Sequence, residues 1–89
     1  MNNRFIRNEL FLGEEICKKI SNLSILVVGC GGVGGYAIES LVRLGVSNFT
    51  LVDNDCVDIT NFNRQIIAVN SNLNKSKVEA FKERILEIN

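Results

Sequence analysis

Four glycines in one short segment are the first residues of this chain whose types and spacing could do chemistry. They are Gly29, Gly31, Gly32 and Gly34. The segment follows an apolar run at 25–28 and precedes an amphipathic stretch. Glycines between a strand and a helix let the backbone approach a ligand, and the N–H groups at the helix start then face an anion. The pattern predicts a phosphate-binding turn, and the alternative is a tight turn without a ligand.

Two acidic residues follow a second apolar run, at 49–52. They are Asp53 and Asp55. Asp53 stands about 20 residues beyond the glycines, the distance at which a carboxylate accepts hydrogen bonds from ribose hydroxyls in dinucleotide-binding units. The spacing therefore predicts a ribose contact, against the alternative of a solvated turn residue. Asp55 is expected either to shape the turn or to approach a metal or ribose.

Two cations further along could bind phosphate. The Arg64 guanidinium can give paired hydrogen bonds to a phosphate. Lys77 is predicted at the first position of a helix, where a cation is unfavourable against the helix dipole unless an anion is held there. Each alone is an ordinary surface cation, but together they predict a second clamp on a polyphosphate. The diphosphate of NAD needs no such clamp, so the pair favours a triphosphate.

The composition describes at most one small globular domain, and more readily a part of one. The chain has 89 residues, 46% of them hydrophobic, and 10 basic residues balance 10 acidic ones, which gives no bulk attraction to nucleic acid. Histidine is absent, which excludes Ser-His or Cys-His catalysis and His-ligated metals within this chain. The three cysteines, without a C-x-x-C pair, favour a reducing, cytoplasmic setting over a disulfide framework. No apolar run approaches the ~20 residues of a membrane span.

A strand, a helix and a second strand must position these residues. Residues 24–28 and 49–52 have the continuous apolar character of parallel strands, and residues 32–44 show helical spacing. This order predicts the α/β fold class, with a Rossmann-like βαβ nucleotide-binding unit, N-terminal helices and a partial parallel sheet. We expect a helical arm over 1–23 and a βαβα core over 24–89.

The remaining segments are less regular. Helical spacing covers 8–21 with a break near Gly13, and an irregular, asparagine-rich stretch covers 56–75. Ser76 and Glu79 have the spacing of a capping box, which predicts the start of a last helix.

We expect the strand at 24–28 to be buried on both faces, because parallel sheets are covered on both sides. Three sets of apolar residues follow helical spacing and are candidates for buried helix faces. They are Leu10, Phe11, Ile16 and Ile20; Val33, Ala37, Leu41 and Leu44; and Val78, Phe81, Ile85 and Ile88.

Five motifs in this order resemble one superfamily over essentially the whole chain. They are Arg4-Phe5-x-Arg7, Gly29-x-Gly31-Gly32-x-Gly34, Leu51-Val52-Asp53-x-Asp55-x-Val57, Asn61-x-Asn63-Arg64-Gln65 and Lys77. The chain is similar in these motifs to the ThiF/MoeB/HesA adenylyltransferases, which are ubiquitin-activating-enzyme-like. Residues 57–66 and 84–89 resemble most the branch that dehydrates threonylcarbamoyladenosine in tRNA.

The resemblance implies ATP and Mg²⁺ as cofactors, an adenylated carboxylate, pyrophosphate release and a homodimer. The residues it assigns to the nucleotide are Gly29, Gly31, Gly32, Gly34, Asp53, Asp55, Asn61, Arg64, Lys77 and Arg7. Among them, Arg64 and Lys77 would act catalytically by stabilising the charge that develops on pyrophosphate. Arg7 matches an arginine that reaches into the neighbouring subunit's site in MoeB-like members. No residue is assigned as a metal ligand.

The acceptor of the adenylate distinguishes the branches. In the dehydratase branch it is the carboxylate of a threonylcarbamoyl group on tRNA, which cyclises with loss of water, so tRNA would be the substrate. In the MoeB and ThiF branches it is the C-terminus of a ubiquitin-like sulfur carrier, with a sulfur-carrier or sulfurtransferase partner. No membrane partner is expected in either case.

The family's later magnesium-holding aspartate, crossover loop and catalytic-cysteine region have no counterpart in these 89 residues. We therefore expect an N-terminal piece that holds most of the ATP site and turns over little alone. Two other function classes stay open at this point. An NAD-binding dehydrogenase domain would explain the glycines and Asp53 but leave Arg64 and Lys77 without a role, and a non-catalytic assembly module would bind no nucleotide.

Overall fold

The computed structural model of the protein describes residues 3–89 and confirms the predicted order of elements. The elements are η1 (Asn3–Phe5), α1 (Ile6–Leu12), α2 (Glu14–Ser21), β1 (Ser24–Val28), α3 (Gly32–Leu44), β2 (Asn48–Val52), η2 (Ile59–Asn61), η3 (Asn70–Asn72) and α4 (Lys77–Ile88). The break predicted near Gly13 separates α1 from α2, and Gly45 caps α3.

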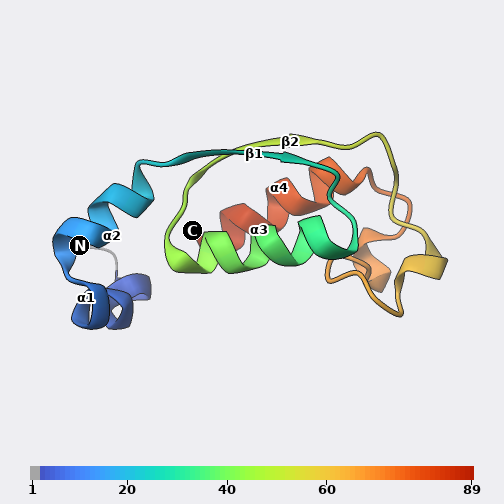
Figure 1. The fold of residues 1–89 in the computed structure, drawn as a ribbon. Coiled ribbons are helices and arrows are strands. Elements are labelled where there is room, and N and C mark those ends of the chain that lie inside the picture. The colour runs from blue at the N-terminus through green and yellow to red at the C-terminus, as the bar shows by residue number, and fades with distance from the viewer. Residues whose placement is uncertain (1–2) are drawn as a thin grey trace.

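The two strands form a parallel sheet, and α3 is the connection between them. The register pairs Ser24 with Asn48 and Val28 with Val52, so the two carboxyl ends lie side by side. Both α3 and α4 run beneath the same face of this sheet (Figure 1). The main core lies in that layer, where Ile38 of α3 and Phe81 of α4 are fully buried. The predicted α/β class and partial parallel sheet are therefore confirmed.

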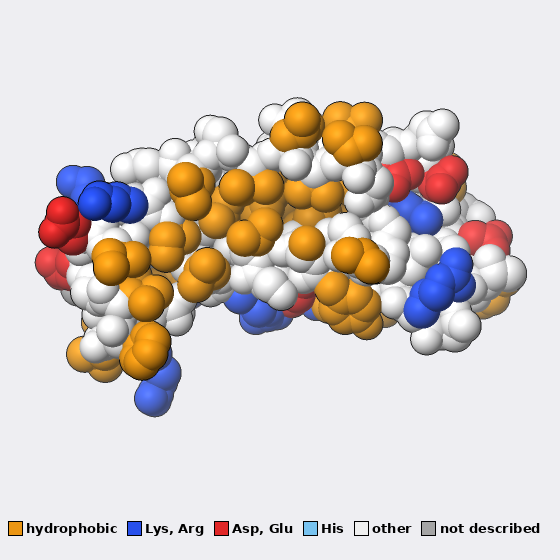
Figure 2. Space-filling model, viewed as in Figure 1, with side chains coloured by type: hydrophobic (Ala, Val, Ile, Leu, Met, Phe, Trp, Pro, Cys, Tyr) orange, Lys and Arg blue, Asp and Glu red, His pale blue; other side chains and the backbone are white. Residues whose placement is uncertain are grey.

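The prediction that residues 24–28 are buried on both faces is wrong for the described chain. Burial alternates along both strands, so that Val27, Phe49 and Leu51 pack on the core. Leu26 and Val28 are 64% and 72% exposed. The reason is that both helices cover one face, and no other described residues cover the second. Figure 2 shows hydrophobic side chains gathered across the middle of the molecule, in the region of the strands.

No helix within residues 3–89 is both long and apolar enough to cross a membrane.

Two of the three predicted helix faces also need correction. Leu10, Phe11 and Ile16 are exposed, because α1 and α2 contact mainly each other rather than the core. On α3 the exposed Val33 and Leu44 belong to the predicted stripe, whereas the buried residues are Gly35, Ile38 and Val42. On α4, Phe81 and Ile85 pack on the core as expected.

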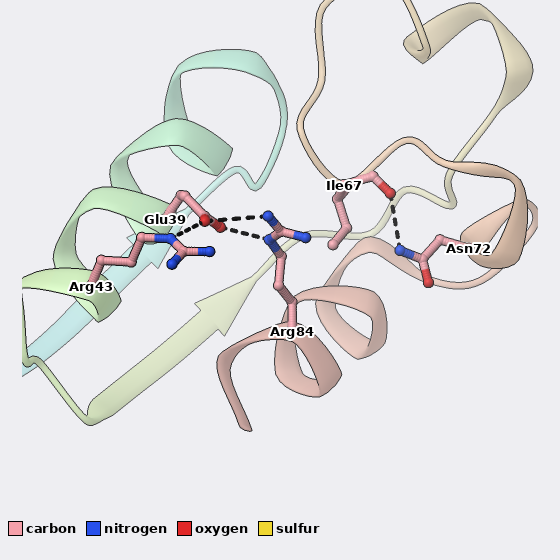
Figure 3. Close-up of polar contacts among 5 residues, drawn as sticks. All are labelled: Glu39, Arg43, Ile67, Asn72 and Arg84. Carbon is pink, nitrogen blue, oxygen red and sulfur yellow. Dashed lines mark hydrogen bonds and ion pairs between the residues drawn. The ribbon is translucent and has the colours of Figure 1, made fainter. Parts of the chain in front are cut away.

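An ion-pair cluster joins α3 to α4. Glu39 of α3 accepts hydrogen bonds from Arg84 Nε at 2.6 Å and from Arg43 Nε at 2.5 Å (Figure 3). The hydrogen bond from Arg84 lowers the pKa of Glu39, outweighing partial burial, which raises it. The helices are thus held together by a charged contact beside their apolar one.

The irregular segment between β2 and α4 is fixed by backbone contacts. Val57 N–H donates to Lys75 O at 2.8 Å, and Asn74 N–H donates to Val57 O at 2.9 Å. Within the segment, Asn72 Nδ2 donates to Ile67 O (Figure 3). Ser76 Oγ accepts from Glu79 N–H, which is the serine half of the predicted capping box. These contacts bring the start of α4 next to the carboxyl end of the sheet.

Candidate functional site

The glycine turn leads directly from β1 into α3. Gly29 has a φ of 88°, which a side chain disfavours, and its N–H donates to Val52 O of β2 at 2.8 Å. A Cβ on Gly34 would lie 1.9 Å from Gly29 O, so the first turn of α3 passes against the backbone of the loop. A Cβ on Gly32 would meet nothing within 4 Å. The turn is therefore tightly closed on its inner side and open at the helix start.

Asp53 braces this turn. Its Oδ2 accepts a hydrogen bond from Cys30 N–H and its Oδ1 accepts one from Asp55 N–H, each at 2.7 Å. Partial burial raises the pKa of Asp53, but these two bonds and the charge of Lys77 outweigh it and leave the pKa below its ordinary value. The carboxylate has about four lone-pair sites, so two remain for other donors. Its contact with a ribose stays a prediction.

Lys77 is the first residue of α4, as predicted, and its side chain is buried beside the turn. The side chain is only 6% exposed, and Nζ lies 3.9 Å from Asp55 Oδ2, a long ion pair. Asp55 itself is exposed, and its carbonyl accepts the Lys77 N–H at 3.0 Å. The ammonium therefore lies at the same edge of the sheet as Asp53. Because its ion pair with Asp55 is long, a bound phosphate could take the place of the Asp55 carboxylate.

Burial of the Cys30 thiol within the turn raises its pKa, and the nearby Asp53 carboxylate adds to this effect, while Lys77 opposes it. A thiol with a raised pKa is poor in thiolate, so a packing role suits it better than a reactive one.

Arg64 is exposed and its guanidinium is held by its own segment. Nη1 donates to Thr60 O at 3.2 Å and to Asn63 Oδ1 at 3.0 Å. A guanidinium has five N–H donors, and these bonds use only one of its nitrogens. The clamp that Arg64 and Lys77 would form on a polyphosphate stays a prediction.

Asn61 has a local structural function. Its Oδ1 accepts from Asp58 N–H at 2.8 Å while Asp58 caps η2 by accepting from Thr60 N–H, a reciprocal cap. Asn61 is buried in this arrangement. Its binding to a nucleotide remains a prediction that the cap does not require.

Arg7 lies far from these residues. It is exposed on α1, at the end of the molecule opposite the turn between β1 and α3 (Figure 1). Within one chain it does not belong to the same site, and the expected reach into a neighbouring subunit stays a prediction.

Gln65, which was not among the expected site residues, is buried beside the glycine turn. It is 8% exposed, its Nε2 lies 3.5 Å from the position of a Cβ on Gly31, and its buried Oε1 has no hydrogen-bond partner among the described residues. Its place beside Arg64 in a motif was visible in the sequence, but its burial against the turn was not.

The assembled groups can bind an anion. The helix start of α3 is open at Gly32, Lys77 supplies a positive charge, and Gln65 supplies an amide beside Gly31. No group of three or more His, Cys, Asp or Glu in residues 3–89 could hold a metal.

Comparison with known proteins decides the family. Residues 3–89 match the ThiF family. The chain belongs to this family. It is 47% identical over its whole length to the tRNA threonylcarbamoyladenosine dehydratase of Bacillus subtilis, of which it spans 35%. It is 43% identical to the enzyme of that name from Escherichia coli, with 97% of the chain aligned to 32% of the relative. The chain thus spans about a third of the length of these relatives.

Solved structures agree with this ThiF assignment and with the predicted Rossmann-like fold. The E. coli tRNA N6-threonylcarbamoyladenosine dehydratase in complex with ATP superposes with a TM-score of 0.92 at 43% identity, covering 97% of this chain and 35% of that one. E. coli MccB with ATP superposes with a TM-score of 0.86 at 31% identity, covering 99% of this chain and 28% of that one. Both relatives were thus crystallised with the same nucleotide.

Proposed function

We propose that this ThiF-family chain binds ATP with Mg²⁺ at the glycine turn and presents it for adenylation of a carboxylate. The observation that carries the proposal is the buried Lys77 ammonium beside the Asp53-braced turn. A dinucleotide site needs the turn and Asp53 alone. The added cation suits a further phosphate, and the ATP complexes of two relatives support this nucleotide over NAD.

The chemistry would be a displacement at the α-phosphorus of ATP. A carboxylate oxygen forms a bond to phosphorus, and the bond to the bridging oxygen of pyrophosphate breaks. The N–H groups at the start of α3 would hold phosphate oxygens, and Arg64 and Lys77 would neutralise the charge that develops on the leaving pyrophosphate. Mg²⁺ would enter with the phosphates and lower the charge that these side chains must offset.

For the acceptor, we propose the carboxylate of a threonylcarbamoyl group on a tRNA adenosine. Relatives at 47% and 43% identity carry the name of that dehydratase. Identity is lower, at 35%, to the SUMO-activating enzyme subunit 2 of Dictyostelium discoideum, whose acceptor is a protein by its name. The tRNA, the homodimer and the use of Arg7 in a neighbouring subunit all belong to this proposal.

Calorimetric titration of the chain with Mg-ATP and separately with NAD tests the nucleotide assignment. We expect ATP to bind and NAD to bind more weakly. Lys77→Met keeps the apolar stem and removes the charge, and Arg64→Ala removes the guanidinium. Each is expected to weaken ATP binding by about 10- to 100-fold, the cost of losing a hydrogen bond to a charged group.

Lys75→Met is the matched control, because Lys75 lies nearby but pairs with Glu83 on the surface. It should leave ATP affinity unchanged. A folded chain that binds no ATP, or binds NAD as tightly, would contradict the nucleotide assignment. For the acceptor, even slow release of AMP and pyrophosphate should depend on tRNA that carries threonylcarbamoyladenosine, and release with a sulfur-carrier protein instead would overturn that part.

A further inference from the structure

Asp58 is an exposed carboxylate that fixes the short helix η2. Its Oδ2 accepts hydrogen bonds from the Thr60 N–H at 2.9 Å and from the Thr60 hydroxyl at 2.5 Å. Its own N–H donates to Asn61 Oδ1 at 2.8 Å. The bond from the Thr60 hydroxyl, together with the bond from the Thr60 N–H, lowers the pKa of Asp58. Thr60 is therefore held through both its backbone and its side chain by an ionised carboxylate.

The residues that Asp58 fixes in turn hold Arg64. The Thr60 carbonyl accepts a hydrogen bond from Arg64 Nη1 at 3.2 Å, and Asn63 Oδ1 accepts one from the same nitrogen at 3.0 Å. The Asn61 carbonyl accepts the Arg64 N–H at 3.2 Å. The capped turn thus contacts Arg64 through both its backbone and its guanidinium.

The way in which Arg64 is held suits a side chain that binds a phosphate. A long exposed side chain loses rotamer freedom when it binds a ligand, and a side chain that is already held loses less. Both side-chain bonds of Arg64 use Nη1, which leaves the N–H groups of Nε and Nη2 to a phosphate. The next residue, Gln65, is buried with its Nε2 beside Gly31, so the segment that carries Arg64 passes next to the glycine turn.

We infer that Asp58 is a positioning residue for Arg64: by capping η2 it fixes the Thr60 carbonyl, and that carbonyl holds the guanidinium ready for the phosphates of a nucleotide at the glycine turn. Asp58 does not itself bind the phosphates, because two anions repel each other. Its effect on nucleotide binding passes through Arg64. This inference rests on the proposed binding of ATP and on the proposed role of Arg64 in it.

The test is a double-mutant cycle on the affinity for Mg-ATP, measured by calorimetry. Asp58→Ala removes the cap and should weaken binding about three- to tenfold. In the Arg64→Ala background, Asp58→Ala should change the affinity by less than about twofold, because the side chain through which Asp58 acts is gone. Asp58→Asn keeps an acceptor oxygen that caps a helix as well as aspartate does. It should bind ATP within about twofold of the wild-type chain.

Asn72→Ala separates a loss of positioning from a loss of stability. It removes the bond from Asn72 Nδ2 to Ile67 O, which lies in the same irregular segment but does not involve Arg64. Thermal unfolding without nucleotide should show a Tm lowered by about 4–8 °C for Asn72→Ala and for Asp58→Ala alike. Only Asp58→Ala should weaken ATP binding.

Several outcomes would overturn the inference while leaving ATP binding intact. They are an unchanged affinity in Asp58→Ala, a double variant whose loss equals the product of the two single losses, and a loss in Asp58→Asn as large as that in Asp58→Ala. The last would make the charge responsible and not the cap. Wild-type affinity in Arg64→Ala would overturn both the role of Arg64 and this inference. Failure of the wild-type chain to bind ATP would overturn the proposed function as well.

Discussion

The carboxyl end of the sheet and its outer face differ in what this chain supplies to them. At the carboxyl end, the N–H groups of Gly29, Cys30 and Asp55 all have partners within 2.8 Å, and Lys77 is buried beside them. On the outer face, Leu26 and Val28 remain largely exposed. A turn is closed by a few hydrogen bonds that one short segment can provide, whereas an apolar face needs a whole second layer. The candidate site is therefore organised by these residues even though the sheet around it is covered on one side only.

The largest effect is expected where the turn is tightest. Gly34→Ala would place a Cβ 1.9 Å from Gly29 O, a clash with backbone that cannot move away freely. We expect a loss of about 3 kcal/mol or more in the free energy of unfolding. Urea denaturation followed by circular dichroism measures it.

Gly32→Ala is the matched control in the same turn, since a Cβ there meets nothing within 4 Å. Its stability should stay equal or rise by up to about 1 kcal/mol, because alanine is the better helix former. Equal losses in the two variants would show that the turn is not closed on its inner side.

A smaller effect is expected at the contact between α3 and α4. Arg84→Met removes the 2.6 Å hydrogen bond to Glu39 while keeping the apolar stem. We expect a loss of about 1 kcal/mol at pH 7, because Arg84 is partly exposed and water screens the pair. Lys75→Met, which breaks a surface pair with Glu83, should cost no more than about 0.5 kcal/mol.

The pH dependence of the Arg84→Met effect sharpens this test. Arg84 holds the pKa of Glu39 below its ordinary value of 4.5 in the folded state. A lowered carboxyl pKa stabilises the fold above the unfolded value, and this contribution disappears as pH falls through the folded value. The difference in stability between wild type and Arg84→Met should therefore be full at pH 7 and shrink below pH 4.5. A difference that grows on acidification would contradict this assignment.

The smallest effect on stability is expected on the outer face. Leu26→Thr changes an exposed side chain within a strand, so the free energy of unfolding should shift by about 0.5 kcal/mol or less. Self-association at high concentration should decrease, since exposed apolar patches promote it. Sedimentation velocity reports the association. Ile38→Ala, at a fully buried position of α3, should instead cost about 2–5 kcal/mol, and similar losses for both variants would show that the outer face is covered in solution.

Much of the fold was predictable from local signals. The errors all concern which faces are buried, because burial is decided by tertiary packing. Gly13, Gly45 and Ser76 mark ends of helices at the expected places. The buried side of α3 was predicted wrongly, because several faces of that helix are apolar. Only tertiary packing selects Ile38 and Val42 over Val33 and Leu44.

The candidate site was predicted only in part, because spacing locates residues along the chain but does not show their tertiary contacts. Spacing placed Asp53 at the end of β2 and Lys77 at the start of α4, and both lie beside the glycine turn. Spacing did not reveal that Asp53 braces the turn, that Asn61 accepts the Asp58 N–H in the cap of η2, or that Gln65 is buried against Gly31.

The sequence by itself determined the order of strands and helices, the glycine turn and the starts and ends of most helices. Those features depend on glycine, capping side chains and periodicity, which act over a few neighbouring residues. The tertiary structure decided which faces are buried and how the site is held. The bond from Cys30 to Asp53 joins residues 23 apart, and the bond from Arg84 to Glu39 joins residues 45 apart. Such contacts exist only after the parallel strands and the two helices have packed together.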